Sequence, residues 1–371
     1  MPTLRRTPSF VAALSLTASL TAAACGGGGS GGGGGTTPVT PTPDPTPTAS
    51  QYVNPVLNTD FPDPGVVKGA DGAYYAYATQ TTGLRIQVAR SADLVTWGSP
   101  GEALPVKPAW AQNSNNFWAP DVNLRENGTY VMYFSAQADS AAGGFCVGMA
   151  TSTSPGGPFT DVGHPVVCGR NGYTIDPQGF DDPQTGKRYL LWGSGPSISI
   201  RPLSATARDS LAAGTAVTTA VQQNTADPYE KVLVEGAWMT YHAPYYYLFY
   251  SAGNCCNQFG AVHYAVMAAR ATSPTGPFEY QRAADGTTVP VLAAATNGRF
   301  IGPGHNAVVT VNGTDYMVYH AVDVNNPILA GTANVSRRPL LVDKITYQAS
   351  GWPIVGASGT PTSTVQTKPG Q

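Results

Sequence analysis

Five ionisable side chains recur along the chain and could carry acid–base chemistry. Each stands in a short run of small or apolar residues, and successive members lie 55 to 70 residues apart: Asp63, Asp121, Asp176, Glu235 and His305. Hydrolysis of a glycosidic bond needs a carboxylic acid that protonates the leaving oxygen and a carboxylate that activates water. A further carboxylate nearby keeps the acid protonated, because like charges oppose a second ionisation. Carboxylates gathered in one pocket would suit this reaction, although each residue alone could equally be a solvated loop residue, and the spacing assigns no roles.

An aromatic or β-branched run follows each of these residues and predicts one strand per repeat. The runs occupy residues 73–78, 129–135, 188–194, 245–251 and 315–321. Turn pairs such as Asn127-Gly128 and Asn312-Gly313 precede them and are typical of hairpins. Five units of about 50–70 residues, each with about four strands, predict an all-β fold, a five-bladed β-propeller. The first strand of each blade lines the axis of a propeller, so the five ionisable residues should converge there.

The composition favours the same fold class and excludes other functions. The chain has 371 residues, of which 43 are Gly, 32 are Pro, 42% are hydrophobic, 10% are aromatic and only 11% are charged. Abundant Tyr, Val, Thr, Gly and Pro favour β-structure rich in turns. The formal net charge is −2. We therefore expect neither a basic nucleic-acid surface nor a polybasic membrane patch.

Five motifs, in this order and at this spacing, resemble glycoside hydrolase family 43, the five-bladed arabinanases and β-xylosidases. They read FPDPGVV around Asp63, WAPD at 118–121, IDPQGFDDPQTGKRYLLWGS around Asp176, VEGAWM around Glu235 and GPGHNAVV around His305. The similarity extends over residues 54–355. Each motif is weak alone, and the complete ordered set carries the resemblance.

The resemblance implies an inverting hydrolase with three catalytic carboxylates. Asp63 is expected to be the general base that activates water, Glu235 the general acid, and Asp176 the residue that orients the acid and keeps it protonated. Base and acid should then lie roughly 6.5–9.5 Å apart. The segment YYYLFYSAGNCC at 245–256 favours arabinan, so the expected reaction is endo or exo hydrolysis of α-L-arabinofuranosyl linkages. The alternatives are a β-xylosidase or arabinofuranosidase on arabinoxylan, and a non-catalytic, surface sugar-binding propeller.

Other residues are candidates for binding. Trp118 could stack on a sugar face and Phe61 could form an apolar wall beside Asp63, but each could equally belong to the core. Asp121 is expected in the pocket or just behind it. The resemblance implies that His305 helps to hold calcium, largely through water. A hydrogen-bonded core histidine is the alternative, because calcium takes six to eight oxygen ligands. The remaining histidines carry no supporting motif and are expected to be structural or at the surface: His164, His242, His263 and His320.

The first 50 residues predict export and tethering. Residues 1–24 read as an export signal with a basic start and an apolar stretch. The sequence AAAC at 22–25 resembles a bacterial lipobox that would lipidate Cys25, although Ala22 replaces the usual Leu; an ordinary cleaved signal is the alternative. Residues 25–50 are expected to form a Gly-rich and Pro/Thr-rich linker, and residues 51–371 the propeller. We expect an exported monomer, lipid-anchored to a bacterial membrane on the periplasmic or cell-surface side, that acts on plant cell-wall polysaccharide.

Four cysteines lie within the expected propeller. Cys146 and Cys168 stand in one repeat and could form a disulfide, which an exported domain permits. Cys255 and Cys256 are adjacent, and a bond between them would be strained. The sequence does not choose among the three possible connectivities.

Overall fold

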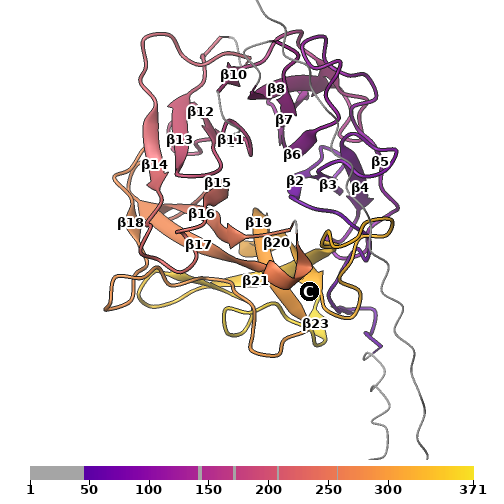
Figure 1. The fold of residues 1–371 in the computed structure, drawn as a ribbon, viewed down its shortest axis with the longest axis vertical. Helices are drawn as coiled ribbons and strands as arrows, with labels where there is room; N and C mark the ends of the chain where they lie inside the picture. The colour runs from indigo at the N-terminus through magenta and orange to yellow at the C-terminus, as the bar shows by residue number, and fades with distance from the viewer. Residues whose placement is uncertain (1–45, 141–143, 170–172, 207–208, 257) are drawn as a thin grey trace, which may run out of the picture. The chain divides into compact units, whose positions relative to one another are not determined.

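Five antiparallel sheets stand around a common axis as the blades of a β-propeller (Figure 1). The computed structural model describes residues 46–140, 144–169, 173–206, 209–256 and 258–371. The predicted export signal, Cys25 and the linker up to residue 45 lie outside these residues. The predicted all-β, five-bladed propeller is confirmed.

The strands nearest the axis carry the motifs, and the second strands are the predicted aromatic runs. The first strands are β2 Gly65–Lys68, β6 Phe117–Leu124, β11 Gln178–Asp181, β15 Val234–His242 and β19 Phe300–Val311. The second strands are β3 Tyr74–Ala78, β7 Tyr130–Gln137, β12 Arg188–Trp192, β16 Tyr245–Asn254 and β20 Thr314–Asp323. Asn312 and Gly313 join β19 to β20 with φ of 50° and 78°, the left-handed pair that a tight hairpin turn requires.

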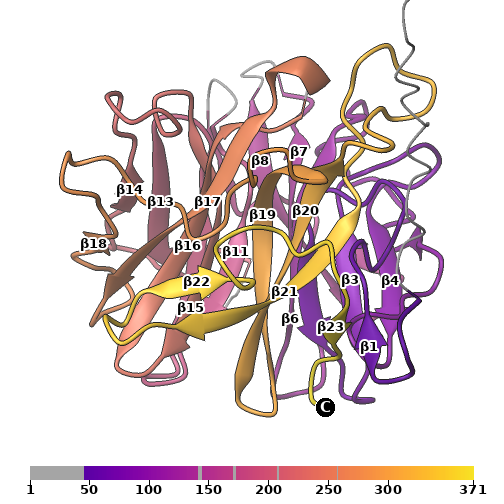
Figure 2. The ribbon, with the colours of Figure 1, turned by 90° about the horizontal axis from the view of Figure 1, so that it is seen from below.

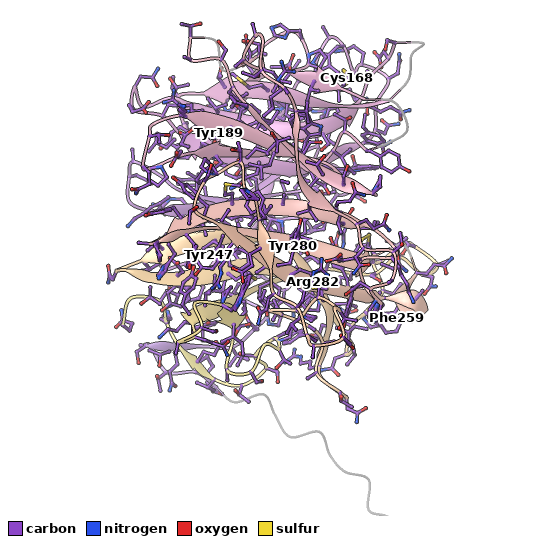
Figure 3. All side chains as sticks on the ribbon, turned by 90° about the vertical axis from the view of Figure 1, so that its left-hand side faces the viewer. Cys168, Tyr189, Tyr247, Phe259, Tyr280 and Arg282 are labelled. Atoms are coloured by element: carbon purple, nitrogen blue, oxygen red, sulfur yellow. A yellow bond between two sulfur atoms is a disulfide. The ribbon has the colours of Figure 1, made fainter. Side chains whose placement is uncertain are left out.

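The outer strands complete each blade. The third strands are β4 Gln87–Ser91, β8 Phe145–Ser152, β13 Ser197–Pro202, β17 His263–Ala271 and β21 Leu340–Tyr347. The outermost are β5 Gly101–Glu102, β9 Thr160–Asp161, β10 Val167–Cys168, β14 Thr218–Gln222, β18 Glu279–Tyr280 and β22 Pro353–Val355. On the outer side of the fourth blade, the Arg282 guanidinium lies 5.0 Å from the ring centroid of Tyr280 (Figure 3).

Alternating side chains of each second strand fill the two spaces beside its blade. In β7, Met132 and Phe134 pack in the cluster shared with the first blade, whereas Val131 and Tyr133 pack in the cluster shared with the third. Successive strand residues point to opposite faces, so a strand buried on both faces needs an unbroken apolar run. Full burial of one such side chain contributes about 1.5–3 kcal/mol. The runs of aromatic residues are therefore what holds the blades together.

The N-terminal segment joins the first blade to the last. Strand β1 (Gln51–Tyr52) pairs with β23 (Gln366–Thr367) at the edge seen in Figure 2. The buried Asn54 side chain donates to the Val342 carbonyl over 3.0 Å and accepts the Val342 N–H over 3.0 Å. These bonds position the start of the domain beside β21.

Two disulfides occur in the described part of the chain. Cys146 pairs with Cys168 across β8 and β10, and Cys255 pairs with Cys256. A short 3-10 helix, η1 (Phe259–Ala261), follows the second pair. No helix within the described ranges is long and apolar enough to cross a membrane.

Candidate active site

Each blade has a residue with left-handed backbone geometry at or near the start of its first strand, and the fifth blade has Gly302 in addition to His305. The corner residues, one from each blade, are Asp63, Ala119, Asp176, Gly236 and His305, with φ between 46° and 58°. Residues other than Gly rarely adopt this conformation, which costs roughly 1–3 kcal/mol and is concentrated at functional sites. Three of the five predicted residues occupy corners.

Glu235 and Asp121 depart from the expected equivalence of the five repeats. Glu235 precedes the corner Gly236 by one residue, and Asp121 follows the corner Ala119 by two. The strand register shifts after Trp118 in β6 and after Glu235 in β15. Such bulges re-aim side chains, and here Trp118 and Glu235 face a cavity whereas Asp121 lies beyond it.

A cavity of about 470 Å³ adjoins the corners. The predicted residues on its wall are Asp63, Trp118, Asp176, Glu235 and His305. Other parts of its wall come from loops of several blades: Asp60, Thr79, Gln80, Leu233, Asn254, Cys255, Cys256, Leu329, Ser336 and Arg338. Four carboxyl groups from three distant stretches of the sequence therefore face one space: Asp60, Asp63, Asp176 and Glu235.

Hydrogen bonds from the preceding blade fix four of the five corners. A second-strand side chain, or one just after that strand, accepts the N–H of the next blade's corner. The pairs are Thr79 Oγ1 with Ala119 N (2.9 Å), Ser135 Oγ with Asp176 N (2.9 Å), Ser251 Oγ with His305 N (2.8 Å) and His320 Nδ1 with Asp63 N (3.1 Å). Together with Ser194, which holds the same place in the third blade, these five side chains form what we call the interblade ring: Thr79, Ser135, Ser194, Ser251 and His320.

Asp63 is surrounded by donors that favour its ionised form. Thr79 donates to its Oδ2 over 2.6 Å and Arg338 to its Oδ1 over 2.8 Å. Burial alone would raise the pKa of Asp63, but Arg338 and then His305 outweigh it, with help from the Thr79 hydrogen bond, and hold that pKa well below its usual range. Asp63 is therefore a carboxylate at neutral pH.

The ring member His320 is a neutral imidazole. Because its Nδ1 accepts the Asp63 N–H, the proton of the ring lies on Nε2. Burial, followed by the nearby Arg338, holds the pKa of His320 well below its usual range. The 3.4 Å approach of Nδ1 to Asp63 Oδ1 is thus not an ion pair.

Asp176 lies beside Glu235 in surroundings that favour its protonated form, in contrast to those of Asp63. Burial, followed by the Glu235 and Asp63 carboxylates, holds the pKa of Asp176 well above its usual range. Glu235 accepts hydrogen bonds from Ser194 at Oε2 (2.7 Å) and from Tyr264 at Oε1 (2.8 Å). Asp176 is therefore held toward its protonated form beside Glu235. One carboxyl group with a lowered pKa and another with a raised pKa on the same cavity are the two environments that acid–base hydrolysis needs.

The three predicted binding residues have different locations. Trp118 lines the cavity, with its ring stacked on Phe145 at a centroid distance of 4.4 Å. Phe61 is fully buried in the core between the fifth and first blades, so its expected place in the cavity wall is wrong. It packs there with Val66 and Tyr74, because the large apolar ring fills the space between the two blades.

Asp121 binds the second blade to the third instead of lining the main cavity. Its Oδ2 accepts the Gly179 N–H over 2.8 Å and an Asn123 N–H over 3.2 Å. Burial raises the pKa of Asp121 to about 7. Of the two expected places, in the pocket or just behind it, Asp121 occupies the second: it borders a small space that Asp63, Asp176 and His305 also line.

His305 lines the cavity, with Nδ1 3.5 Å from Asp63 Oδ1. Among the described residues there is no group of three or more His, Cys, Asp or Glu side chains arranged to hold a metal ion. Calcium binds six to eight oxygens, and one imidazole beside one carboxylate does not fit that need. The calcium expectation has no support in the residues present.

Several residues of the site were not singled out from the sequence: Thr79, Ser194, Tyr264, His320 and Arg338. The ring members had a detectable signal, since each stands five residues after the start of an aromatic run. The five segments read YYAYAT, YVMYFS, YLLWGS, YYLFYS and DYMVYH, beginning at 74, 130, 189, 246 and 315. Arg338 had no such signal, because it reaches Asp63 only through the closure of the propeller.

Comparison with known proteins gives a consistent result. The sequence model of a family described as "Glycosyl hydrolases family 43" matches residues 52–353. A probable arabinan endo-1,5-alpha-L-arabinosidase A of Aspergillus clavatus is 30% identical over 312 residues, which are 79% of this chain and 90% of that protein. The arabinan endo-1,5-alpha-L-arabinosidase A of Aspergillus niger is 29% identical, with the same coverage of 79% and 90%.

Solved structures share the fold. A thermostable family-43 glycoside hydrolase aligns with a TM-score of 0.69 and 26% identity over 86% of this chain and 99% of its own. The alpha-L-arabinanase of Cellvibrio cellulosa aligns with a TM-score of 0.65 and 22% identity over 80% of this chain and 96% of its own.

Proposed function

The chain belongs to glycosyl hydrolases family 43 and is a glycosidase; on that premise we propose that it hydrolyses α-L-arabinofuranosyl linkages of arabinan with inversion of the anomeric configuration. The observation that carries the reaction type is the contrast on one cavity wall between Asp63, whose pKa is held low by Arg338, and Asp176, whose pKa is raised by burial and by the Glu235 carboxylate beside it. The names of the relatives similar to the chain over 79% of its length support arabinan as the substrate.

The proposed roles follow the family resemblance and the surroundings of each group. Asp63 takes a proton from a water molecule, whose oxygen attacks the anomeric carbon of the sugar. The bond from that carbon to the leaving oxygen breaks, and Glu235 gives its proton to this oxygen. Asp176 keeps the acid supplied with a proton, because a second negative charge beside Glu235 is unfavourable. Asp63 then loses its extra proton to solvent and Glu235 regains one.

Trp118 and His305 complete the proposed site. An aromatic ring can stack on the apolar face of a sugar, and Trp118 presents such a ring to the cavity. His305 adds a hydrogen-bonding group beside Asp63. We assign both to substrate positioning.

Product analysis tests the proposal. Linear arabinan, arabinoxylan and aryl glycosides would be incubated with the protein, and the first product would be followed by proton NMR. We expect cleavage of arabinan, with oligosaccharides if the action is endo and arabinose alone if it is exo, and an initial anomer opposite to that of the substrate. Cleavage of xylosides alone would replace the substrate assignment, and retention of the anomer would contradict the roles of Asp63 and Glu235.

The acid assignment has its own variant. Glu235→Gln keeps the shape of the side chain and the acceptor at Oε1 but has no proton to give. We expect a loss of about 10²- to 10⁴-fold in kcat, with unchanged thermal unfolding and sugar binding. Turnover at the wild-type rate would remove Glu235 from the role of acid.

We further propose that the protein is exported and tethered through Cys25. The basic start, the apolar stretch of residues 1–24 and the Gly-rich linker support this proposal, as do the two disulfides, which persist in oxidising compartments. Membrane fractionation with a labelled fatty acid should find label in the wild type and none in Cys25→Ala. Equal partition of both proteins into the soluble fraction would contradict the anchor.

A further inference from the structure

One member of the interblade ring makes a different hydrogen bond from the other four. Thr79, Ser135, Ser251 and His320 each accept the backbone N–H of the next corner. Ser194 instead donates its hydroxyl to Glu235 Oε2 over 2.7 Å. The ring therefore departs from its pattern beside the proposed acid.

Because Ser194 bonds to Glu235, the N–H of Gly236, the corner residue of the fourth blade, has a different hydrogen-bond acceptor. The Gly236 N–H, which the pattern would direct to Ser194, donates to Asp176 Oδ2 over 3.3 Å. Glu235 and Gly236 are consecutive, so one stretch of backbone is bonded to Asp176 while its neighbouring carboxyl is bonded to Ser194. These two hydrogen bonds fix the positions of the Asp176 and Glu235 carboxyl groups relative to each other.

A second hydroxyl holds the other oxygen of Glu235. Tyr264, on β17, donates to Oε1 over 2.8 Å and is itself buried. Its ring lies against Gly304 of the GPGHN motif, where an added Cβ would come within 2.0 Å of Tyr264 Cε1. A glycine at 304 is thus needed for Tyr264 to reach Glu235.

Hydroxyl groups suit an acid that must alternate between two protonation states. A hydroxyl donates to a carboxylate and accepts from a carboxylic acid, so its bond to Glu235 survives both states. An Arg side chain has donors only and favours the ionised form alone, as Arg338 does for Asp63. The acid is held by groups that tolerate its proton, and the base is held by a cation.

We propose that Ser194 is a positioning residue of the general acid: its hydroxyl, together with that of Tyr264, fixes the Glu235 carboxyl in the orientation from which the proton reaches the leaving oxygen. The inference rests on the proposed function of Glu235. Ser194 touches no reacting atom and acts through Glu235.

Leaving-group dependence separates positioning of the acid from general support of the fold. A dinitrophenyl leaving group departs without a proton, whereas a sugar hydroxyl needs one. Ser194→Ala should therefore slow cleavage of an unactivated arabino-oligosaccharide by roughly 10- to 100-fold while changing cleavage of the matching dinitrophenyl glycoside by less than about threefold. Ser194→Thr, which keeps the hydroxyl as Thr79 does, should restore most of the loss.

Ser91→Ala is the control. Ser91 is buried on β4, away from the cavity wall, and its hydroxyl donates to Asp93. The variant should affect both substrates by the same factor, because the lost bond supports the fold and does not contact Glu235, Ser194 or Tyr264. Tyr264→Phe provides a second variant with the leaving-group dependence expected of Ser194→Ala, should the latter fail to fold.

The outcomes separate the inference from the function on which it rests. Equal slowing of both substrates by Ser194→Ala and by Tyr264→Phe, or no slowing of either substrate, would overturn the positioning role. If Glu235→Gln itself shows no leaving-group dependence, the acid assignment fails first and Ser194 falls with it. If the wild type cleaves xylosides only, the same comparison on xylosides still decides the role of Ser194.

Discussion

Arg338 Nη1 lies 2.8 Å from Asp63 Oδ1, so a residue beside the last blade holds the proposed base of the first. His305, which also contributes to the low pKa of Asp63, comes from the fifth blade as well. The charge state of Asp63 is therefore a property of the closed propeller, and the first blade alone cannot supply it.

Replacing Arg338 should move the acidic limb of the pH profile. Asp63 must be ionised to act as base, so activity falls as the pH drops through its pKa. Arg338→Gln removes the largest of the influences that lower this pKa, and the acidic limb of kcat/KM should rise by roughly one to two pH units. Arg337→Gln is the control, since Arg337 bonds to Asn58 and should leave the limb in place. An unmoved limb in Arg338→Gln would contradict the control of Asp63 by Arg338.

Asp176→Asn should lower the activity and raise the stability of the protein at neutral pH. The folded pKa of Asp176 lies above its unfolded value of 3.8. Its contribution to stability is therefore complete below that value and is lost as the pH rises toward the folded pKa. The amide does not ionise, so the variant should gain about 1–2 kcal/mol at neutral pH and lose the gain at about pH 3. Chemical denaturation at both pH values checks this, and a gain that is independent of pH would argue against an electrostatic cause.

Asp121→Asn should leave catalysis intact. The Asp121 side chain joins Gly179 and Asn123 and does not reach the main cavity, so kcat and KM should remain within about twofold of wild type. Its pKa is raised to about 7, so Asp121 makes the wild type lose stability as the pH rises from 3.8 toward 7, and the variant should lose less over the same range. A large rise in KM would instead show that Asp121 contributes to substrate binding.

Trp118→Ala should weaken substrate binding more than it slows the reaction. Loss of one stacking face should raise KM by about three- to tenfold, with a smaller change in kcat. Trp118→Phe keeps an aromatic face on the ring of Phe145 and should recover much of the affinity. Equal KM values in all three proteins would show that the sugar does not use this face.

The sequence alone determined the repeat and most of the chemistry. Aromatic runs such as that of β7 can be buried on both faces only between two sheets, so their five-fold recurrence predicted blades and the second strands. Asp63, Asp121, Asp176 and Glu235 were candidates because an acidic residue amid small, apolar neighbours is rare in a chain that is 11% charged, and the resemblance to the family then selected Asp63, Asp176 and Glu235.

Only the tertiary structure decided which way each side chain points, which residues it contacts and how the pKa of each carboxyl group is shifted. Phe61 and Trp118 are both aromatic residues next to a motif, but packing buries one, whereas a bulge turns the other toward the cavity. Arg338 lies 275 residues from Asp63, and no local pattern predicts their contact. The pKa of a carboxyl depends on burial and on charges within a few ångströms. These neighbours come from different blades, so whether each carboxyl group holds its proton is set when the propeller closes.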